Sequence, residues 1–181
     1  MQIISGKFAR RKLIAPQGSE TRPTLARVKE SVFSMIQDRI ADSSVLDIFA
    51  GSGAFAAECA SRGAADVVLI DQSVEAAKAI KKNLREMEYT LVPLELEHAL
   101  ARLKNLGKKF DIIFMDPPYD GDLGFVALRL IARYSLLKPQ GKIIFETRSQ
   151  NNLPKLPKSY IIRKDRSYGT ARILILEQNN E

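Results

Sequence analysis

Short apolar runs alternate along the chain with segments in which apolar residues recur every three or four positions. The runs are typical of buried strands and cover residues 45–49, 66–70, 90–96, 110–115 and 142–146. The recurring spacing predicts helices over residues 24–40, 54–62, 74–88, 98–106 and 123–137. Because strands and helices alternate, we expect a mostly parallel sheet with helices on both faces.

Hairpin patterns mark the two ends of the chain. Residues 2–5 and 12–15 predict a small hairpin around Gly6. Residues 160–164 and 172–177 predict two antiparallel strands that would complete a seven-stranded sheet. The fold class is therefore expected to be α/β, with a mostly parallel sheet and a C-terminal antiparallel hairpin.

Proline and glycine divide the remaining segments. Lys138-Pro139-Gln140-Gly141 is expected to be a turn before the fifth strand, and residues 148–158 a surface linker. We expect residues 1–42 to form a basic extension of a hairpin and a helix. Residues 43–181 would then form the main domain.

Basic residues gather at both ends of the chain, which carries 181 residues and a net charge of +7. Residues 1–30 hold seven Lys or Arg against two Glu, and residues 148–172 hold seven against one Asp. Basic ends on a near-neutral middle favour a polyanion as partner. The one cysteine and one histidine argue against a disulfide and a zinc site. Without an apolar run near ~20 residues or a secretion signal, we expect a cytoplasmic location.

One apolar run ends in an acid, two prolines and an aromatic ring. Asp116-Pro117-Pro118-Tyr119 follows residues 110–115 directly. Proline has a fixed φ and no N–H, so the strand must stop at Asp116, where open α/β sheets bind ligands. The Asp116 carboxylate and Pro117 carbonyl would offer two acceptors beside the ring of Tyr119. This set suits a planar group with an exocyclic –NH₂, although it is also a common strand ending.

A glycine turn follows the first strand of the main domain, in the run Asp47-Ile48-Phe49-Ala50-Gly51-Ser52-Gly53. Glycines at a strand-to-helix turn let the backbone approach a ligand closely. Asp71 ends the next strand, 20 residues after Gly51, where a carboxylate can accept both hydroxyls of a ribose. The pair predicts an adenosine-type ligand. Residues 51–56 also match G-x-G-x-x-A, so the motif by itself permits a nicotinamide dinucleotide.

Asp47 distinguishes the two cofactors. A carboxylate beside the glycine turn would repel a pyrophosphate, whereas it attracts a sulfonium and an ammonium group. Together with the amine-binding set at Asp116, this charge predicts S-adenosylmethionine as the cofactor.

These motifs resemble the class I amino-methyltransferases with a Rossmann-like fold. More narrowly, the chain is similar to the bacterial 16S rRNA guanine-N2 methyltransferase family. The similarity covers nearly the whole chain and rests on the site motifs above and on Ile4-Ser5-Gly6-Lys7, Thr21-Arg22-Pro23-Thr24, Arg27-Val28-Lys29-Glu30 and Ser61-Arg62-Gly63-Ala64. It implies methylation of guanine N2 in 16S rRNA within the assembling small ribosomal subunit, with residues 1–42 facing the RNA.

Two positions depart from that family's pattern. Glu97-His98-Ala99 stands where the family often has Gly-Asp-Ala, so the usual acid beside the adenine is either missing or replaced by His98 or Glu97. Tyr168-Gly169-Thr170 stands where many members have Tyr-Gly-Asp-Thr, which leaves the role of the C-terminal hairpin open.

The candidate site residues follow from the motifs and the resemblance. Catalysis is assigned to Asp116, Pro117 and Tyr119, with Tyr119 stacking on a flipped-out base. Cofactor contacts are assigned to Asp47, Phe49, Ala50, Gly51, Ser52, Gly53, Asp71, Gln72, His98 and Asp116. Contacts to RNA are assigned to Arg10, Arg11, Lys12, Arg22, Thr24 and Arg27, with the five basic residues holding phosphates. No metal is expected.

Other functions use some of the same residues. Methylation of adenine N6 or cytosine N4 is chemically equivalent at the Asp116 motif, so the choice of guanine rests on the resemblance. An NAD(P)-dependent oxidoreductase would use the glycines but leaves Asp116 and the basic ends unexplained. A non-catalytic RNA-binding assembly factor would not need Asp47, Asp71 and Asp116 together.

Overall fold

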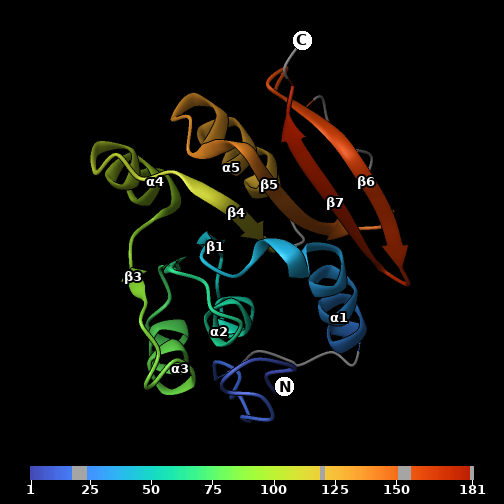
Figure 1. The fold of residues 1–181 in the computed structure, drawn as a ribbon. Coiled ribbons are helices and arrows are strands. Elements are labelled where there is room, and N and C mark those ends of the chain that lie inside the picture. Colours follow the sequence, from blue (N-terminus) through green and yellow to red (C-terminus); the bar gives the residue numbers. More distant parts are fainter. Residues whose placement is uncertain (18–23, 119–120, 151–155, 180–181) are drawn as a thin grey trace.

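A seven-stranded sheet with helices on both faces forms the body of the protein (Figure 1). The computed structural model describes residues 1–17, 24–118, 121–150 and 156–179, and only the backbone for residues 24–27. The strands are β1 (Ser44–Ile48), β2 (Asp66–Ile70), β3 (Thr90–Val92), β4 (Phe110–Met115), β5 (Leu137–Arg148), β6 (Tyr160–Tyr168) and β7 (Ala171–Gln178). The helices are α1 (Thr24–Ile36), the short 3-10 helix η1 (Gln37–Arg39), α2 (Ala54–Ser61), α3 (Val74–Asn83), α4 (Leu96–Asn105) and α5 (Leu123–Arg133).

The strand order is β3-β2-β1-β4-β5-β7-β6. Strands β1 to β5 pair in parallel, and β7 pairs antiparallel with both β5 and β6. This confirms the expected α/β class with a mostly parallel sheet and a C-terminal antiparallel hairpin. The order reverses between β1 and β4, which is the place where sheets of this kind bind ligands.

Alternating residues of the strands supply the two sides of the core. One cluster packs α4 and α5 against one face, and the other clusters pack α1, α2 and α3 against the opposite face. Burying both faces explains why the central strands read as continuous apolar runs. None of the described helices is long and apolar enough to cross a membrane.

The first residues of the chain lie on the outside of this core. Residues 1–17, here called the N-terminal arm, contain a single antiparallel bridge between Gln2 and Lys12 instead of two strands. Ile3 and Leu13 of the arm are buried against α2 and β2. The expected hairpin is thus present in reduced form: the Ile3 N–H donates to the Arg11 carbonyl at 3.0 Å and the Leu13 N–H to the Met1 carbonyl at 2.9 Å. The turn of the arm is also bonded to α2, through the Lys7 N–H and the Ser61 carbonyl at 2.7 Å.

Several element bounds differ from the sequence expectation. The expected turn at residues 138–141 lies inside β5, where the pairing with β4 loses register between Phe110 and Ile112. Strand β3 ends at Val92, because Pro93 cannot donate to the ladder, and α4 begins at Leu96. Helix α3 ends at Asn83, well before residue 88, and the following turn holds Glu86 at a φ of 68°.

Candidate active site

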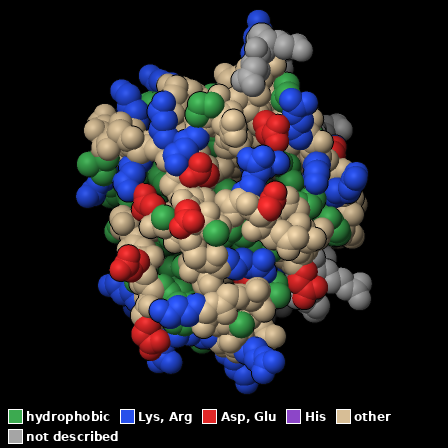
Figure 2. All heavy atoms as spheres, in the orientation of Figure 1, with side chains coloured by type: hydrophobic (Ala, Val, Ile, Leu, Met, Phe, Trp, Pro, Cys, Tyr) green, Lys and Arg blue, Asp and Glu red, His purple; other side chains and the backbone are tan. Residues whose placement is uncertain are grey.

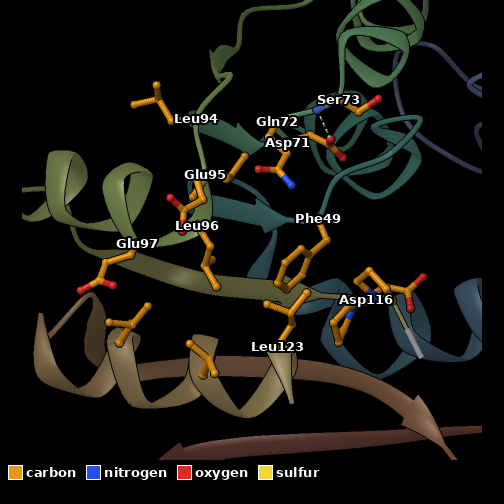
Figure 3. A pocket seen from close by; sticks show the side chains of 15 residues that line it. Phe49, Asp71, Gln72, Ser73, Leu94, Glu95, Leu96, Glu97, Asp116 and Leu123 are labelled. Atoms are coloured by element: carbon orange, nitrogen blue, oxygen red, sulfur yellow. Dashed lines mark hydrogen bonds between the residues drawn. The ribbon is translucent and has the colours of Figure 1, made fainter. Parts of the chain in front are cut away.

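The parallel register brings the chemistry-bearing strand ends to one edge of the sheet. Ile48 of β1 pairs with Ile70 of β2 and with Met115 of β4. The next residues, Phe49, Asp71 and Asp116, therefore leave the sheet side by side, although they are far apart in sequence. All three line one cavity (Figure 3).

The turn after β1 owes its shape to three residues with positive φ. Phe49, Gly51 and Gly53 have φ values of 62°, 55° and 69°. A side chain on Gly53 would also approach Leu84 and Leu69 to 2.9 and 3.1 Å, so this glycine lets α2 pack closely on its neighbours. A side chain on Gly51 would meet only the Phe49 carbonyl oxygen, at 3.9 Å. Glycine is favoured at position 51 by the positive φ of the backbone and not by close packing. The two glycines of the motif therefore serve different needs.

Asp71 holds two loops of the site together. Its carboxylate accepts hydrogen bonds from the backbone N–H of Gly51 at 2.8 Å and of Ser73 at 2.9 Å. Figure 3 shows the second of these bonds at the rim of the cavity. Each oxygen of an ionised carboxylate can accept more than one hydrogen bond, so Asp71 can also receive a ligand hydroxyl.

The cavity at this edge has a volume of about 580 Å³ and mixes apolar walls with acids. Apolar side chains from β2, α4, α5 and the loops after β1 and β3 line it, namely Phe49, Ile70, Leu94, Leu96, Leu123, Val126 and Leu130. Asp71 and Asp116 lie at separate places on its wall, and Gln72 belongs to the lining (Figure 3). Flat apolar walls with a few polar groups are typical of a site for an aromatic ligand such as an adenosine.

Of the two candidates for the adenine side, the structure places Glu97 at this cavity and His98 outside its lining. The His98 side chain is 77% exposed, with Nδ1 3.3 Å from a carboxylate oxygen of Glu95. One residue of helix rotation separates the two side chains, and the sequence spacing did not indicate which would face inward.

Asp47 is a buried acid, only 1% exposed, behind the glycine turn. Its Oδ2 accepts the N–H of Ala56 at 3.2 Å, in the first turn of α2. Burial raises the pKa of the Asp47 carboxyl well above its ordinary value, and the neighbouring Asp116 and Asp71 carboxylates raise it further. A cation bound at the turn would lower the pKa of Asp47, because it stabilises the ionised carboxylate. The position therefore favours a positively charged ligand group.

A second cavity, of about 1060 Å³, adjoins the first. It lies between the N-terminal arm, α1, the glycine turn and the ends of β1, β4 and β5. Phe49 and Asp116 line both cavities, so these two residues mark the boundary between them. Asp47, Ala50, Gly51 and Ser52 line the second cavity.

The loop that carries Asp116 is held by packing. Pro117 is buried, and a side chain on Gly124 of α5 would meet the Phe145 ring at 2.6 Å and Pro117 Cγ at 2.9 Å. Gly124 thus allows the start of α5 to press on Pro117. Nothing in the sequence around Gly124 indicates this close approach. Tyr119 lies outside the described residues.

The predicted RNA-contacting residues of the arm divide into two kinds. Arg10 and Lys12 are exposed and line the second cavity. Arg11 instead donates to the Arg85 carbonyl at 2.7 Å and to Glu86 at 2.8 Å, and its guanidinium lies 4.3 Å from the Phe8 ring centre. Arg11 therefore fixes the arm to the end of α3. Thr24 begins α1 as expected, but its side chain, that of Arg27 and all of Arg22 lie outside the described residues.

Two further polar residues support the site and were missed from sequence. Glu58 of α2 is fully buried and accepts the backbone N–H groups of Ile4 and Ser5 in the arm. Asn83 accepts the N–H of Ile14 at 2.9 Å and donates to the carbonyls of Ile14 and Ser52 at 2.8 Å each. It thereby joins the arm to the glycine turn. In the part of the chain that the structure describes, no group of His, Cys, Asp and Glu could hold a metal ion.

Replacing Asp71 by alanine should weaken cofactor binding. The change removes both the acceptor for a ligand diol and the acceptor that orders the Gly51 turn, and each charged hydrogen bond is worth about 1.5–3 kcal/mol. We expect the dissociation constant for S-adenosylmethionine, measured by calorimetric titration, to rise by about 10- to 100-fold. Glu75→Ala, an exposed acid in the first turn of α3, is the control and should leave it unchanged. Unchanged affinity in Asp71→Ala would remove Asp71 from the site.

The strand order with an antiparallel β7, the glycine turn and the shared edge define the class of the protein as a Rossmann-like class I methyltransferase. Within this class, the chain belongs to the family described as "Conserved hypothetical protein 95", whose model matches residues 1–177.

Three similar proteins cover nearly the whole chain. A Bacillus subtilis protein named "Putative rRNA methyltransferase YlbH" is 33% identical over 98% of this chain and 99% of its own. The "Ribosomal RNA small subunit methyltransferase D" of Escherichia coli K12 is 31% identical over 93% of this chain and 85% of its own. The solved structure "Putative methyltransferase yhhF from Escherichia coli" superposes with a TM-score of 0.85 at 27% identity, covering 100% and 99% of the two chains.

Proposed function

We propose that this protein transfers a methyl group from S-adenosylmethionine to the exocyclic N2 of a guanine in 16S rRNA. The observation that carries the methyl-transfer assignment is the position of Asp116 on the wall shared by two cavities, one suited to an adenosine and the other open to the basic arm. The rRNA assignment is supported by two relatives that match nearly the whole chain and are named as rRNA methyltransferases.

The residues at the first cavity fit the cofactor. Asp71 would accept the ribose hydroxyls, and Phe49 and Leu96 would hold the adenine between apolar walls. Asp47 lines the second cavity instead, and its carboxyl, whose pKa is raised by burial, would ionise where the cationic groups of the cofactor reach across the boundary. When bound, S-adenosylmethionine supplies a methyl group on a positively charged sulfur, which keeps the bonding electrons as the methyl leaves.

Asp116 would act on the base that enters the second cavity. The exocyclic nitrogen of guanine is a poor nucleophile because its lone pair is delocalised into the ring. An Asp116 oxygen and the Pro117 carbonyl would accept its two N–H groups, which favours tetrahedral geometry at nitrogen and stabilises the positive charge that develops as the new C–N bond forms. Electrostatic stabilisation of this kind is worth about 3–4 kcal/mol for one group. The nitrogen then loses one proton, to the Asp116 carboxylate or to water, and regains neutrality.

The N-terminal arm would deliver the RNA. Arg10 and Lys12 lie at the second cavity, where their charges can hold phosphates while a base enters. Lys and Arg side chains are numerous on the face shown in Figure 2, with fewer acids between them. An rRNA within the assembling small subunit would be the substrate, and the enzyme would then act in the cytoplasm.

The assignment is tested by mapping the product. Small ribosomal subunits from a strain that lacks this enzyme are incubated with the purified protein and tritiated S-adenosylmethionine, and the rRNA is digested to nucleosides. We expect the label in N2-methylguanosine at one position. Label in N6-methyladenosine or N4-methylcytidine would show that adenine or cytosine, and not guanine, is the substrate. Absence of label would reject the assignment of methyl transfer.

A further inference from the structure

The second cavity contains a buried acid that methyl transfer as described above does not use. Glu146 lies near the end of β5, is 3% exposed, and belongs to the cavity lining. Met115 pairs with Phe145 across β4 and β5, so the next residues on these parallel strands, Asp116 and Glu146, lie beside each other. The cavity therefore presents two neighbouring carboxylates at the place where the amine would react.

The second cavity has basic side chains at its exposed side, a buried acid inside and aromatic rings in its wall. The basic side chains of the arm, Arg10 and Lys12, are exposed, whereas Glu146 is buried. Phe55 and Phe114 also line the cavity, and their rings stack at 4.1 Å with an interplanar angle of 8°. A nucleotide would meet cations with its phosphate and carboxylates with the hydrogen-bond donors of its base.

The neighbours of the exocyclic amine differ among the bases. In guanine the amine lies between N1–H, a donor, and N3, an acceptor. In adenine and cytosine the amine has an acceptor ring nitrogen on its Watson–Crick side and no ring donor on either side. An ionised carboxylate only accepts hydrogen bonds, so an acid beside Asp116 can pair with N1–H of guanine and is repelled by the ring nitrogen of the other two bases.

Building on the proposed function, we infer that Glu146 selects guanine by accepting its N1–H while Asp116 accepts an N–H of the amine. The pair of carboxylates reads two adjacent donors, and guanine is the amino-bearing base that has them. Glu146 is thus a specificity-determining residue, and it fixes which side of the base faces β5. A flipped base is commonly read at this Watson–Crick edge.

The inference is tested with 2-aminopurine, which keeps the amine at C2 but has a bare acceptor at N1. The guanine methylated by the wild-type protein is mapped first, and small subunits are reconstituted with guanine or 2-aminopurine at that position. Single-turnover rates are then measured across a range of subunit concentrations. We expect the wild type to prefer guanine by at least about 100-fold in kcat/KM, because a bare N1 would face a carboxylate.

Glu146→Gln should lower kcat/KM for guanine by about 10- to 100-fold and narrow the preference over 2-aminopurine to less than about 10-fold. The amide can donate to the bare N1, which the carboxylate cannot. Glu146→Asp keeps the charge and should retain the preference at a lower rate, so it provides the test if Glu146→Gln folds poorly. Glu177→Gln, an ion-paired acid on the adjacent strand β7, should leave both rates unchanged.

Two results would overturn the inference. One is an unchanged preference in Glu146→Gln, whether or not the rate falls, since that describes a structural residue. The other is a wild type that methylates guanine and 2-aminopurine equally. A wild type that methylates no guanine in the mapping experiment would instead reject the proposed function, so the two failures can be told apart.

Discussion

Replacing Asp116 by alanine is expected to lower the rate of methyl transfer by about 100- to 1000-fold, the usual effect of removing one electrostatic group from a reacting centre. The variant loses the charged acceptor that stabilises the developing positive nitrogen. The neighbouring Pro117 and Phe49 of the first cavity are retained. The measurement is a single-turnover assay at saturating S-adenosylmethionine with small subunits in excess.

The loss of rate in Asp116→Ala can be distinguished from a loss of cofactor affinity. Asp71 and Asp47 carry the proposed charge contacts to the cofactor, so its affinity in Asp116→Ala should stay within a few-fold of the wild type. Asp116→Asn keeps one uncharged acceptor and should fall between the wild type and alanine. Turnover like that of the wild type in Asp116→Ala would refute the catalytic assignment.

Asp111 offers a matched control on the same strand. Its carboxylate accepts the N–H of Ser44 at 2.8 Å and pairs with Lys138 at 2.7 Å, near the opposite end of β4. Asp111→Ala should therefore lower the free energy of unfolding and leave the single-turnover rate near that of the wild type. A rate loss confined to Asp116 would locate the effect at the cavity rather than in the strand.

The local pattern of apolar and polar residues was sufficient to predict the fold class. Strands β2 and β4 have the predicted bounds because each is a short apolar run between polar breakers. The alternation of elements predicted the parallel sheet, and the sheet then brings Asp47, Asp71 and Asp116 to one edge. The largest error in a strand lies where pairing across the sheet outweighs local preference, at residues 138–141. There β5 continues through Pro139 and Gly141 because Leu137 pairs with Phe110.

Contacts between distant segments could not be predicted from the sequence. Asn83 and Gly124 carry no local sign that they meet the arm and Pro117. The positions of Glu97 and His98 depend on a single step of rotation at the start of α4, which the approximate spacing of apolar residues does not determine. The roles of Arg10 and Arg11 differ for a similar reason, since Arg11 has partners at the end of α3, more than 70 residues away.

Glu58 is the strongest example of such a contact. Its carboxylate is 0% exposed and accepts the backbone N–H groups of Ile4 at 2.7 Å and Ser5 at 3.0 Å. It also pairs with Lys29 of α1 at 3.0 Å and with Arg62 at 2.8 Å. One buried acid on α2 thus joins the arm to α1, the two segments that line the second cavity opposite the strand ends.

The pKa of Glu58 shows which influence dominates. Burial alone would raise this pKa, but the hydrogen bonds from Ile4 and Arg62 and the charge of Lys29 outweigh burial and lower it. The carboxylate is therefore better stabilised in the folded chain than in the unfolded chain, where the pKa is about 4.3. Its contribution to stability is complete above that value and is lost as the pH falls through the lower pKa of the folded state.

Glu58→Gln should consequently lower the free energy of unfolding at pH 7 by about 3–5 kcal/mol, since it removes the buried partner of two partly buried cations and the charged acceptor of two backbone N–H groups. For a chain of this length that corresponds to a fall in Tm of roughly 10 °C. The arm should open first, because the amides of Ile4 and Ser5 lose a charged acceptor. Amide hydrogen exchange at these two residues should then accelerate more than exchange in β1 and β4.

The same variant should bind rRNA more weakly, because a detached arm no longer holds Arg10 and Lys12 at the cavity. Glu75→Gln removes an exposed pair with Lys78 and should change Tm by no more than about 1 °C, since such a pair is worth about 0.3–0.5 kcal/mol. The stability difference between the wild type and Glu58→Gln should also shrink as the pH falls below the unfolded-state pKa of about 4.3, and should be lost as the pH passes the lower pKa of the folded state. An equal difference at pH 7 and at pH 3 would show that the charge of Glu58 does not hold the arm, and that its shape alone does.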